Sequence, residues 1–421
     1  MGILLGCIAD DFTGATDLAG MLVEAGMRTV MTIEVPTSGV SIDTDALVIA
    51  LKSRTIPAQD AVNQSLSALH WLQEAGCRQY FFKYCSTFDS TDQGNIGPVT
   101  DALLDALGSN FTIACPAFPK NKRTLYKGHL FVGDVLLNES GMQHHPLTPM
   151  TDANLVRVLG RQAKHRVGLV PYDIVKQGEQ AIRQAFTSLA EEGYRYAIVD
   201  ALEDSHLMAI GHACADMPLV TGGSGISMGL PDNFRRKGLL KAEIQADKLP
   251  TIEGKSVVLS GSCSPATQEQ VAIMQQKYPS FKLDPLRLAE GPEQINEVMV
   301  WATPLLEKGP VLIYATSKPG EVKAVQNKLG VERASQVIEN AFAEIARHLV
   351  EVGVRKFIVA GGETSGAVVR ALNVSALRIG PQIAPGVPWT TSLNDKPFAL
   401  ALKSGNFGSK NFFQEALDSQ P

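Results

Sequence analysis

The fold is decided near the start of the chain by Ile3-Leu4-Leu5-Gly6-Cys7-Ile8-Ala9, an apolar run that ends at Asp10-Asp11-Phe12-Thr13-Gly14. A strand covered by helices on both faces is apolar throughout, so this run predicts a buried parallel strand. The segment that follows, 13–25, has helical apolar spacing and stops before Gly26, which predicts a helix. A strand followed at once by a helix is the unit of a doubly wound sheet.

The same alternation continues along most of the chain. Short β-branched runs predict strands, and the amphipathic stretches between them predict helices. The predicted strands are 3–9, 28–33, 46–51, 78–83, 111–115, 167–170, 196–199, 218–221, 255–259, 311–314, 357–360 and 398–402. The sequence therefore predicts an α/β protein with an N-terminal doubly wound, mostly parallel sheet and a C-terminal α/β domain.

The pattern also predicts how the chain divides. Between 231 and 254 the periodicity weakens and charge rises, which predicts a linker between domains at 1–230 and 255–421. Residues 116–150, rich in proline and glycine, predict a long irregular excursion that is either functional or a protruding arm. Whether it builds a homodimer interface or covers a binding site stays open at this point. In the second domain, a helix over 331–352 carries an apolar stripe from Val331 to Leu349, for which core packing is the ordinary explanation.

Composition excludes several classes of protein. Lys and Arg total 38 against 43 Asp and Glu, so the net charge is −5 and offers no global basic excess for nucleic acid. No apolar stretch approaches the roughly 18–20 residues that span a bilayer, and no secretory signal is expected. The six cysteines form no Cys-x-x-Cys pair, which argues against a zinc ribbon and for reduced thiols. We expect a cytoplasmic protein without nucleic-acid or membrane partners.

Two adjacent carboxylates, Asp10 and Asp11, arrive at the C-terminal end of the first strand. Ligands bind at this edge of open α/β sheets. Capping of the next helix by Asp11 or Thr13 is the simpler explanation. It accounts for one residue, but not for two carboxylates followed by Gly14, which lets a backbone approach a ligand closely.

Cations and hydroxyls follow two other predicted strands. They suit a small polyhydroxylated anion, because Arg holds a carboxylate bidentately and Lys serves as a point charge. Since parallel strands end at one edge, these loops should lie together. The candidates are Lys52, Ser53 and Arg54 after one strand, Lys83, Ser86, Thr87 and Asp89 after the other, and Lys120, Lys122 and Arg123 from the arm.

Two glycine-rich loops, 219–226 and 359–367, each follow a strand and precede a helix. This order aims backbone N–H groups at phosphate. The second loop lacks the Lys-Ser/Thr of a Walker A motif. Together with Ser260-Gly261-Ser262 and the 403–408 stretch, it predicts a triphosphate site in the C-terminal half.

The combination resembles the four-carbon acid sugar kinase family over essentially the whole chain. It rests on the segments 9–17, 52–54, 83–91, 259–262, 361–366 and 403–408. The resemblance implies ATP-dependent phosphorylation of the 4-hydroxyl of 3-oxo-tetronate, with D-threonate or another four-carbon acid as the alternative. It implies nucleotide contacts at Ser260, Gly362, Glu363, Thr364, Ser365 and Gly405, with Mg²⁺ on the ATP.

The catalytic roles are a hypothesis from the residues. Asp10 or Asp11 would orient the alcohol and take its proton, with Asp89 as the reserve candidate, while Arg54 or Lys83 would hold the substrate carboxylate. No metal ligands are assigned. Two other functions are alternatives. The doubly wound pattern also suggests an NAD-dependent dehydrogenase, but this sequence lacks the glycine fingerprint of that class. A non-catalytic sugar-acid sensor would bind ligand without producing ADP.

Overall fold

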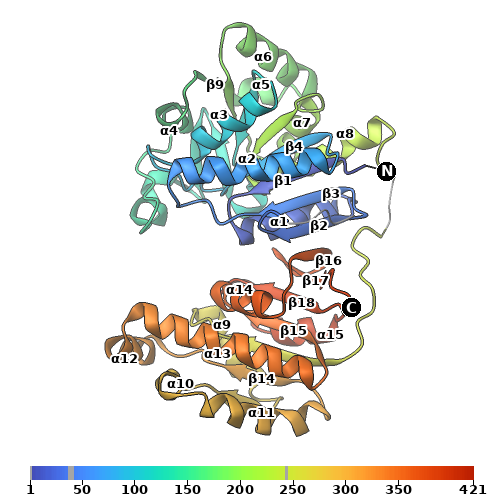
Figure 1. Cartoon of the computed structure of the whole chain (residues 1–421). Coiled ribbons are helices and arrows are strands. Elements are labelled where there is room, and N and C mark those ends of the chain that lie inside the picture. Colours follow the sequence, from blue (N-terminus) through green and yellow to red (C-terminus); the bar gives the residue numbers. More distant parts are fainter. Residues whose placement is uncertain (1, 37–41, 242–244) are drawn as a thin grey trace. The chain divides into compact units, whose positions relative to one another are not determined.

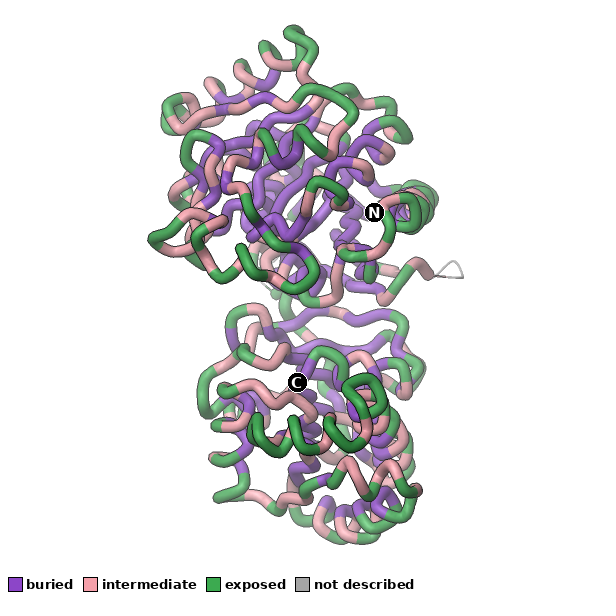
Figure 2. The backbone as a smooth tube through the Cα atoms, turned by 90° about the vertical axis from the view of Figure 1, so that its left-hand side faces the viewer, coloured by how far each residue is buried: buried purple, intermediate pink, exposed green. Residues whose placement is uncertain are grey.

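The computed structural model describes residues 2–36, 42–241 and 245–421, and Figure 1 shows its elements. The chain forms two compact units, Met1–Ala246 and Asp247–Pro421. Each unit contains its own run of strands, and Figure 2 shows that the buried residues are concentrated in the interior of each unit. The α/β class predicted from the sequence is confirmed.

The sheet of the first unit has the strand order β2-β3-β1-β4-β11-β5-β10-β9. Every pairing along this order is parallel. The strands are β1 (Leu5–Ala9), β2 (Thr29–Ile33), β3 (Ala46–Ala50), β4 (Gln79–Lys83), β5 (Thr112–Cys115), β9 (Val167–Val170), β10 (Tyr196–Val199) and β11 (Leu219–Gly222). All five residues of β1 are buried, so both faces of the sheet are covered, as the apolar run 3–9 predicts.

Two groups of helices cover this sheet. In one group α2 packs on α3 and α3 on α4, and in the other α1 and α7 pack on the 3₁₀ helix η4. The helices are α1 (Phe12–Glu24), α2 (Ala58–Glu74), α3 (Ile96–Ala106), α4 (Leu155–Gln162), α5 (Tyr172–Val175), α6 (Glu179–Glu191), α7 (Asp204–Ala213), η4 (Ser224–Gly229) and α8 (Leu230–Arg236).

The arm predicted to be irregular is largely ordered. Its strands β6 (Arg123–Tyr126), β7 (His129–Val132) and β8 (Val135–Leu136) form a small antiparallel sheet, and the 3₁₀ turns η1 (Pro119–Asn121), η2 (Leu137–Glu139) and η3 (Gly141–His144) flank it. Asp200, after β10, accepts hydrogen bonds from the N–H groups of Lys127, Gly128 and Tyr172 at 2.6–2.9 Å. This buried carboxylate attaches the small sheet to the C-terminal end of β10 in the main sheet.

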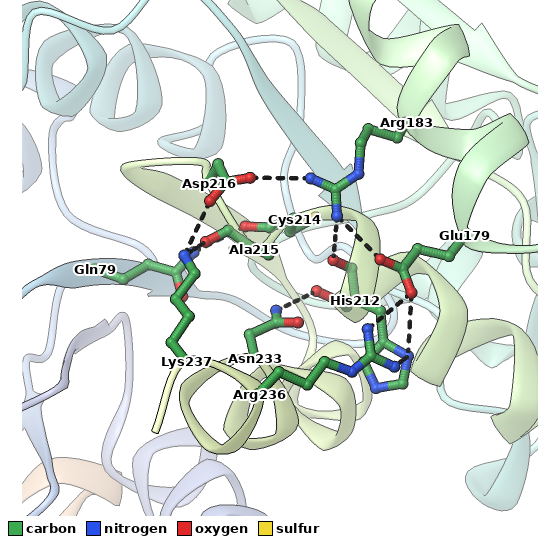
Figure 3. Close-up of polar contacts among 11 residues, drawn as sticks. Gln79, Glu179, Arg183, His212, Cys214, Ala215, Asp216, Asn233, Arg236 and Lys237 are labelled. Carbon is green, nitrogen blue, oxygen red and sulfur yellow. Dashed lines mark hydrogen bonds and ion pairs between the residues drawn. The ribbon is translucent and has the colours of Figure 1, made fainter. Parts of the chain in front are cut away.

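The segment predicted as a linker begins within the first unit, where α8 starts at Leu230. Figure 3 shows the polar network that holds it: Arg236 donates to Glu179 of α6 at 2.9 Å, and Lys237 donates to Asp216 at 2.9 Å. Arg183 of α6 bonds the same two carboxylates, each at 3.0 Å. Part of the predicted linker, 242–244, lies outside the described residues.

The second unit has a mixed sheet with the order β13-β14-β12-β15-β18-β17-β16. The pairings from β13 to β18 are parallel, and β18-β17-β16 are antiparallel. Its strands are β12 (Lys255–Ser260), β13 (Ser280–Lys282), β14 (Val311–Tyr314), β15 (Val354–Ala360), β16 (Ala376–Ala384), β17 (Val387–Ser392) and β18 (Ala399–Lys403). Its helices are α9 (Pro265–Met274), α10 (Pro285–Glu290), α11 (Glu293–Leu306), α12 (Pro319–Leu329), α13 (Val331–Glu351), α14 (Gly362–Ala371) and α15 (Phe412–Asp418).

The hairpin β16–β17 was not predicted. Gly380 and Pro381 interrupt β16, where the pairing register shifts, and glycine and proline argue against a strand in the sequence. The fully buried Trp389 of β17 nevertheless joins the core of this unit with Val258, Ile358 and Phe412. Tertiary packing here overrides the local signal.

Candidate acid-sugar and nucleotide sites

The candidate residues of the first unit converge because its strands are parallel and in register. Ala9 of β1 pairs with Ala50 of β3 and with Lys83 of β4, and Lys83 pairs with Gly222 of β11. The residues that follow these strand ends therefore meet at one edge, as the sequence predicts.

Arg54 lies at the centre of this edge and contacts three carboxylates. It donates to both oxygens of Asp10, from Nε at 2.9 Å and from Nη2 at 2.8 Å. Nη2 also donates to Asp11 Oδ1 at 2.8 Å, and Nη1 lies 3.7 Å from Asp89 Oδ2. Burial raises the pKa of Asp10, and the charge of Arg54 offsets part of that rise. The guanidinium is thus committed to the protein's own carboxylates.

Asp11 has a structural role and one uncommitted oxygen. It is the N-cap of α1, and its Oδ1 accepts the N–H of Gly14 at 2.9 Å, so the capping explanation is correct for this residue. Its Oδ2 has no hydrogen bond within the described chain, and the side chain is 30% exposed, against 8% for Asp10. A ligand can therefore reach Asp11 Oδ2.

Lys83 is a buried cation without an ion pair to any described carboxylate. Only 3% of the residue is exposed, and its Nζ donates to the carbonyl of Tyr84 at 2.7 Å. A Cβ at Gly14 would lie 2.9 Å from this Nζ, so the ammonium lies directly against the first turn of α1. A buried ammonium beside a helix N-terminus is well suited to an anion.

The loop after β4 has an unfavourable backbone. Phe88 and Asp89 both have positive φ, 64° and 26°, which costs on the order of 1–3 kcal/mol each for such residues. The conformation brings Asp89 Oδ1 to 2.6 Å from the hydroxyl of Thr87, while Ser86 is half-buried with no side-chain bond in the described structure. Backbone strain of this kind is concentrated at functional sites.

Sequence reasoning missed Asn95. It occupies the N-cap position of α3, but its amide does not cap the helix. Instead Nδ2 donates to the carbonyls of Ser53, Arg54 and Ile56 at 2.7–3.2 Å and so fixes the loop that carries Arg54. An Asn before a helix predicts only a cap, so the sequence held no signal for this role.

Other candidates lie apart from this cluster. Lys52, Lys120 and Lys122 are exposed and make no ion pair in the part of the chain described, and Arg123 donates to the carbonyl of Asn121. The glycine-rich loop 219–226 belongs to the first unit, and its glycines serve packing: a Cβ at Gly223 would lie 2.7 Å from the carbonyl oxygen of Pro116. Ser224 there donates to Asp17 of α1.

In the second unit the strand ends again meet at one edge. Ser260 pairs with Ala360 and with Tyr314, and Ala360 pairs with Lys403. Above this edge lies a cavity of about 450 Å³, within the usual size of ligand pockets. Of the predicted nucleotide residues, Gly362, Glu363, Thr364 and Gly405 line it, joined by Gly261, Ser262, Cys263 and Gly361.

The first turn of α14 is shaped for an anion. Gly361 has φ 123°, which favours glycine, and a Cβ there would lie 3.0 Å from Thr364 Oγ1 and 3.2 Å from the amide nitrogen of Ser262. No described side chain caps this helix, so its first N–H groups remain available. A free helix N-terminus beside glycines is a favourable phosphate site.

Two predicted nucleotide residues lie behind the cavity wall. Ser260 is fully buried, and its hydroxyl bonds Thr316 Oγ1 at 2.7 Å. Ser365 is 3% exposed, and its Oγ has no hydrogen-bond partner among the described residues. Neither side chain therefore lines the cavity.

Lys403 begins the 403–408 stretch, but the sequence analysis predicted no individual role for it. It is 1% exposed, and Nζ donates to Thr267 Oγ1 and to the carbonyls of Ser404 and Gly405 at 2.9–3.1 Å. No described carboxylate pairs with it, and burial lowers its pKa to about 8. Its ammonium therefore lies 2.9 Å from the carbonyl oxygen of Gly405, which lines the cavity, and no described carboxylate neutralises it.

This pKa predicts opposite pH dependences for nucleotide binding and for stability. Phosphates favour the charged ammonium, so ADP affinity should fall as pH rises above about 8. The folded state binds fewer protons than the unfolded chain between about 8 and 10.5, so this residue's contribution to unfolding free energy rises there. Calorimetric titration of ADP from pH 7 to 10 measures the first effect, and denaturant unfolding without nucleotide measures the second.

Lys403→Met provides the comparison. It should bind ADP more weakly at pH 7 and lose the decline between pH 8 and 10. A variant whose pH profile matches that of the unaltered protein would assign the decline to another group.

The described residues contain no cluster of three His, Cys, Asp or Glu side chains that could hold a metal ion. Around Asp10, Asp11 and Asp89 the guanidinium of Arg54 occupies the place that a divalent cation would need.

No helix in the described ranges is long and apolar enough to span a membrane. All six cysteines are free, four of them buried.

Comparison with known proteins identifies both units. Residues 5–230 match a family described as a sugar-binding N-terminal domain, and residues 257–413 match a nucleotide-binding C-terminal domain. A 3-oxo-tetronate kinase of Burkholderia multivorans is 62% identical over 414 residues, covering 98% of this chain and 96% of the relative. This chain belongs to the 3-oxo-tetronate kinase family.

Solved structures of similar chains share the fold of this kinase. The crystal structure of Haemophilus influenzae protein HI1011 is 49% identical, with a TM-score of 0.89 over 98% of this chain and 99% of that one. A Salmonella typhimurium LT2 structure, described as a tRNA synthase, is 47% identical, with a TM-score of 0.91 over 99% of each chain. The kinase thus has an N-terminal sugar-binding and a C-terminal nucleotide-binding domain.

Proposed function

We propose that this kinase transfers the γ-phosphoryl group of ATP to the 4-hydroxyl of 3-oxo-tetronate. The proposal is carried by one observation: this chain has two complementary sites. In one, Lys83 lies beside a carboxylate cluster, and in the other, a glycine-lined cavity lies at a free helix N-terminus. The names of the relatives support this substrate. The description of the Salmonella structure would suggest RNA as a partner, but a net charge of −5 supplies no global basic excess for binding RNA phosphates.

Lys83 binds the substrate carboxylate in this proposal. Arg54, the other candidate, already directs Nε and Nη2 at Asp10 and Asp11. Lys83 makes no ion pair with a described carboxylate, although its charge helps to lower the pKa of Asp10, and its burial strengthens its attraction for an anion. Thr87 and the half-buried Ser86 lie in the adjoining loop, where hydroxyls of a sugar acid would find partners.

Asp11 orients the 4-hydroxyl and accepts its proton. Its Oδ2 is uncommitted in the described structure, whereas both oxygens of Asp10 bond Arg54. Phosphoryl transfer passes through a loose transition state, so the proton leaves late and positioning contributes most. Asp10 then acts as a positioning residue that fixes Arg54, and Arg54 in turn contacts Asp11.

ATP phosphates bind at the Gly361–Thr364 turn, with Gly405 on the other wall of the cavity. No group of three His, Cys, Asp or Glu side chains in the described ranges could hold a metal ion, which fits a magnesium ion that arrives on ATP and keeps mostly phosphate and water ligands. That ion would neutralise phosphate charge. The chain's own contribution is to bind both substrates and to accept the proton.

A coupled ADP-release assay tests the function. The panel contains 3-oxo-tetronate, D-threonate and other four-carbon acids, and NMR of the product locates the phosphorylated carbon. The expected result is the highest kcat/KM with 3-oxo-tetronate and a phosphate on C4. Highest activity on D-threonate, or tight acid binding without ADP release, would contradict the proposal.

Lys83→Gln should raise the KM for 3-oxo-tetronate about 10- to 100-fold, because it removes a charge-assisted hydrogen bond of about 1.5–3 kcal/mol. The KM for ATP should not change. Lys52→Gln, an exposed lysine on a neighbouring loop, is the matched control and should behave as the unaltered protein does. Equal changes in both KM values for Lys83→Gln would indicate a general structural role instead.

A further inference from the structure

Helix α12, Pro319–Leu329, contributes no buried residue to the fold. One of its faces is nonetheless half-buried: Val322, Val325, Gln326 and Leu329 recur at helical spacing. The first three of these side chains line the 450 Å³ cavity. The inner face of α12 therefore borders an open space rather than the core.

The start of α13 borders the same space. Core packing, the ordinary explanation for the apolar stripe from Val331 to Leu349, is correct for the buried Phe342, Ile345 and Leu349. It is wrong for Val331, which is 65% exposed, and for the half-buried Ile338, because both line the cavity. Two helices thus present apolar side chains to a cavity whose remaining wall is glycine and hydroxyl.

We propose that α12 and α13 form the base subsite of the nucleotide and that Gln326 selects adenine. The inference rests on the proposed function only in that the occupant is a nucleotide. The two parts of the site are continuous, because the phosphate-binding turn Gly361–Thr364 and the apolar wall of Val322, Val325 and Ile338 belong to one cavity. A flat, weakly polar ring is the part of ATP that an apolar wall accepts.

Gln326 is the polar group on this wall that is free to recognise the base. Its side-chain amide has no hydrogen-bond partner in the described structure, and it faces the cavity from a half-buried position. The other polar candidates are engaged: Glu321 accepts from Lys282 at 2.8 Å, and Ser335 donates to Glu339 at 3.1 Å. An amide pairs bidentately with the N6 amino group and N7 of adenine, whereas hypoxanthine offers two acceptors there.

Binding of ADP, IDP and pyrophosphate to the full chain tests this inference by calorimetry. The unaltered protein should bind ADP about tenfold more tightly than IDP. Gln326→Leu should bind ADP about tenfold more weakly, bind ADP and IDP alike, and leave pyrophosphate affinity unchanged. Asn327→Leu, on the exposed side of the same helix, should behave as the unaltered protein does.

Val325→Asp gives an independent measurement at the apolar wall. The base would cover a carboxylate at this half-buried position, whereas pyrophosphate would not reach it. The variant should therefore bind ADP at least tenfold more weakly and leave pyrophosphate affinity unchanged. Three results would overturn the inference: no preference for ADP over IDP in the unaltered protein, an unchanged preference in Gln326→Leu, or equal loss of ADP and pyrophosphate in both variants.

The two proposals can fail separately. If ADP is preferred over IDP through Gln326 but no four-carbon acid is phosphorylated, the base subsite stands and the proposed reaction is wrong. If 3-oxo-tetronate is phosphorylated while Gln326→Leu retains the preference for ADP, the reaction stands and the base subsite is wrong.

Discussion

Asp11→Asn should lower kcat about 100- to 10,000-fold and leave the KM for ATP within about twofold, because a positioned proton acceptor contributes on this scale. The substitution removes charge and basicity at Oδ2 and keeps the shape of the side chain. Asparagine caps helices as well as aspartate does, so α1 should still begin at Phe12. Steady-state kinetics with 3-oxo-tetronate and ATP give both constants.

Asp60→Asn is the matched control, because Asp60 is also an acidic residue at the start of a helix and is exposed. Its kcat should equal that of the unaltered protein. Asp89→Asn separates the remaining candidates, since Asp89 approaches the same guanidinium at 3.7 Å. A mild loss in Asp11→Asn combined with a severe loss in Asp89→Asn would transfer the role to Asp89.

The edge that carries the acid-sugar site could be predicted because it depends on strand direction alone. Apolar runs mark buried parallel strands, parallel strands end together, and so Asp10, Arg54 and Lys83 had to meet. Their division of roles could not be predicted. It depends on which carboxylates Arg54 contacts, and that is set by side-chain packing and by the Asn95 amide that holds the Arg54 loop.

Some residues of the nucleotide cavity could likewise be predicted from the sequence, and others could not. Glycine and hydroxyl residues after strands indicated Gly362, Thr364 and Gly405, which line it. The apolar stripe of α13 could not be divided between core and cavity, because both environments select the same residues. The burial of Lys403 was equally hidden, since a lysine at a strand end usually lies in water.

Arg54→Met should destabilise the first unit by about 3 kcal/mol, toward the lower end of the usual 3–5 kcal/mol for breaking a buried ion pair. The lower value is expected because the side chain of Arg54 is 21% exposed and solvent screens part of the interaction. For a unit of this size, the unfolding temperature should fall by roughly 6–12 °C. Thermal unfolding of the full chain measures this change, and Arg157→Met, which breaks a pair on an exposed arginine, should leave the transition unmoved.

The pH dependence and a second substitution identify the cause of that loss. Burial already raises the pKa of Asp10, and loss of Arg54 should raise it further, so the folded variant binds a proton that the unfolded chain releases. Its unfolding free energy therefore falls as pH rises above the ordinary aspartate range, and the deficit should be largest near pH 7 and smaller near pH 5. Adding Asp10→Asn removes the unpaired charge and should recover most of the stability at pH 7. If the double variant unfolds at the same temperature as Arg54→Met, the loss comes instead from the packing of the Arg54 side chain, and Asp10 is not the group that Arg54 stabilises.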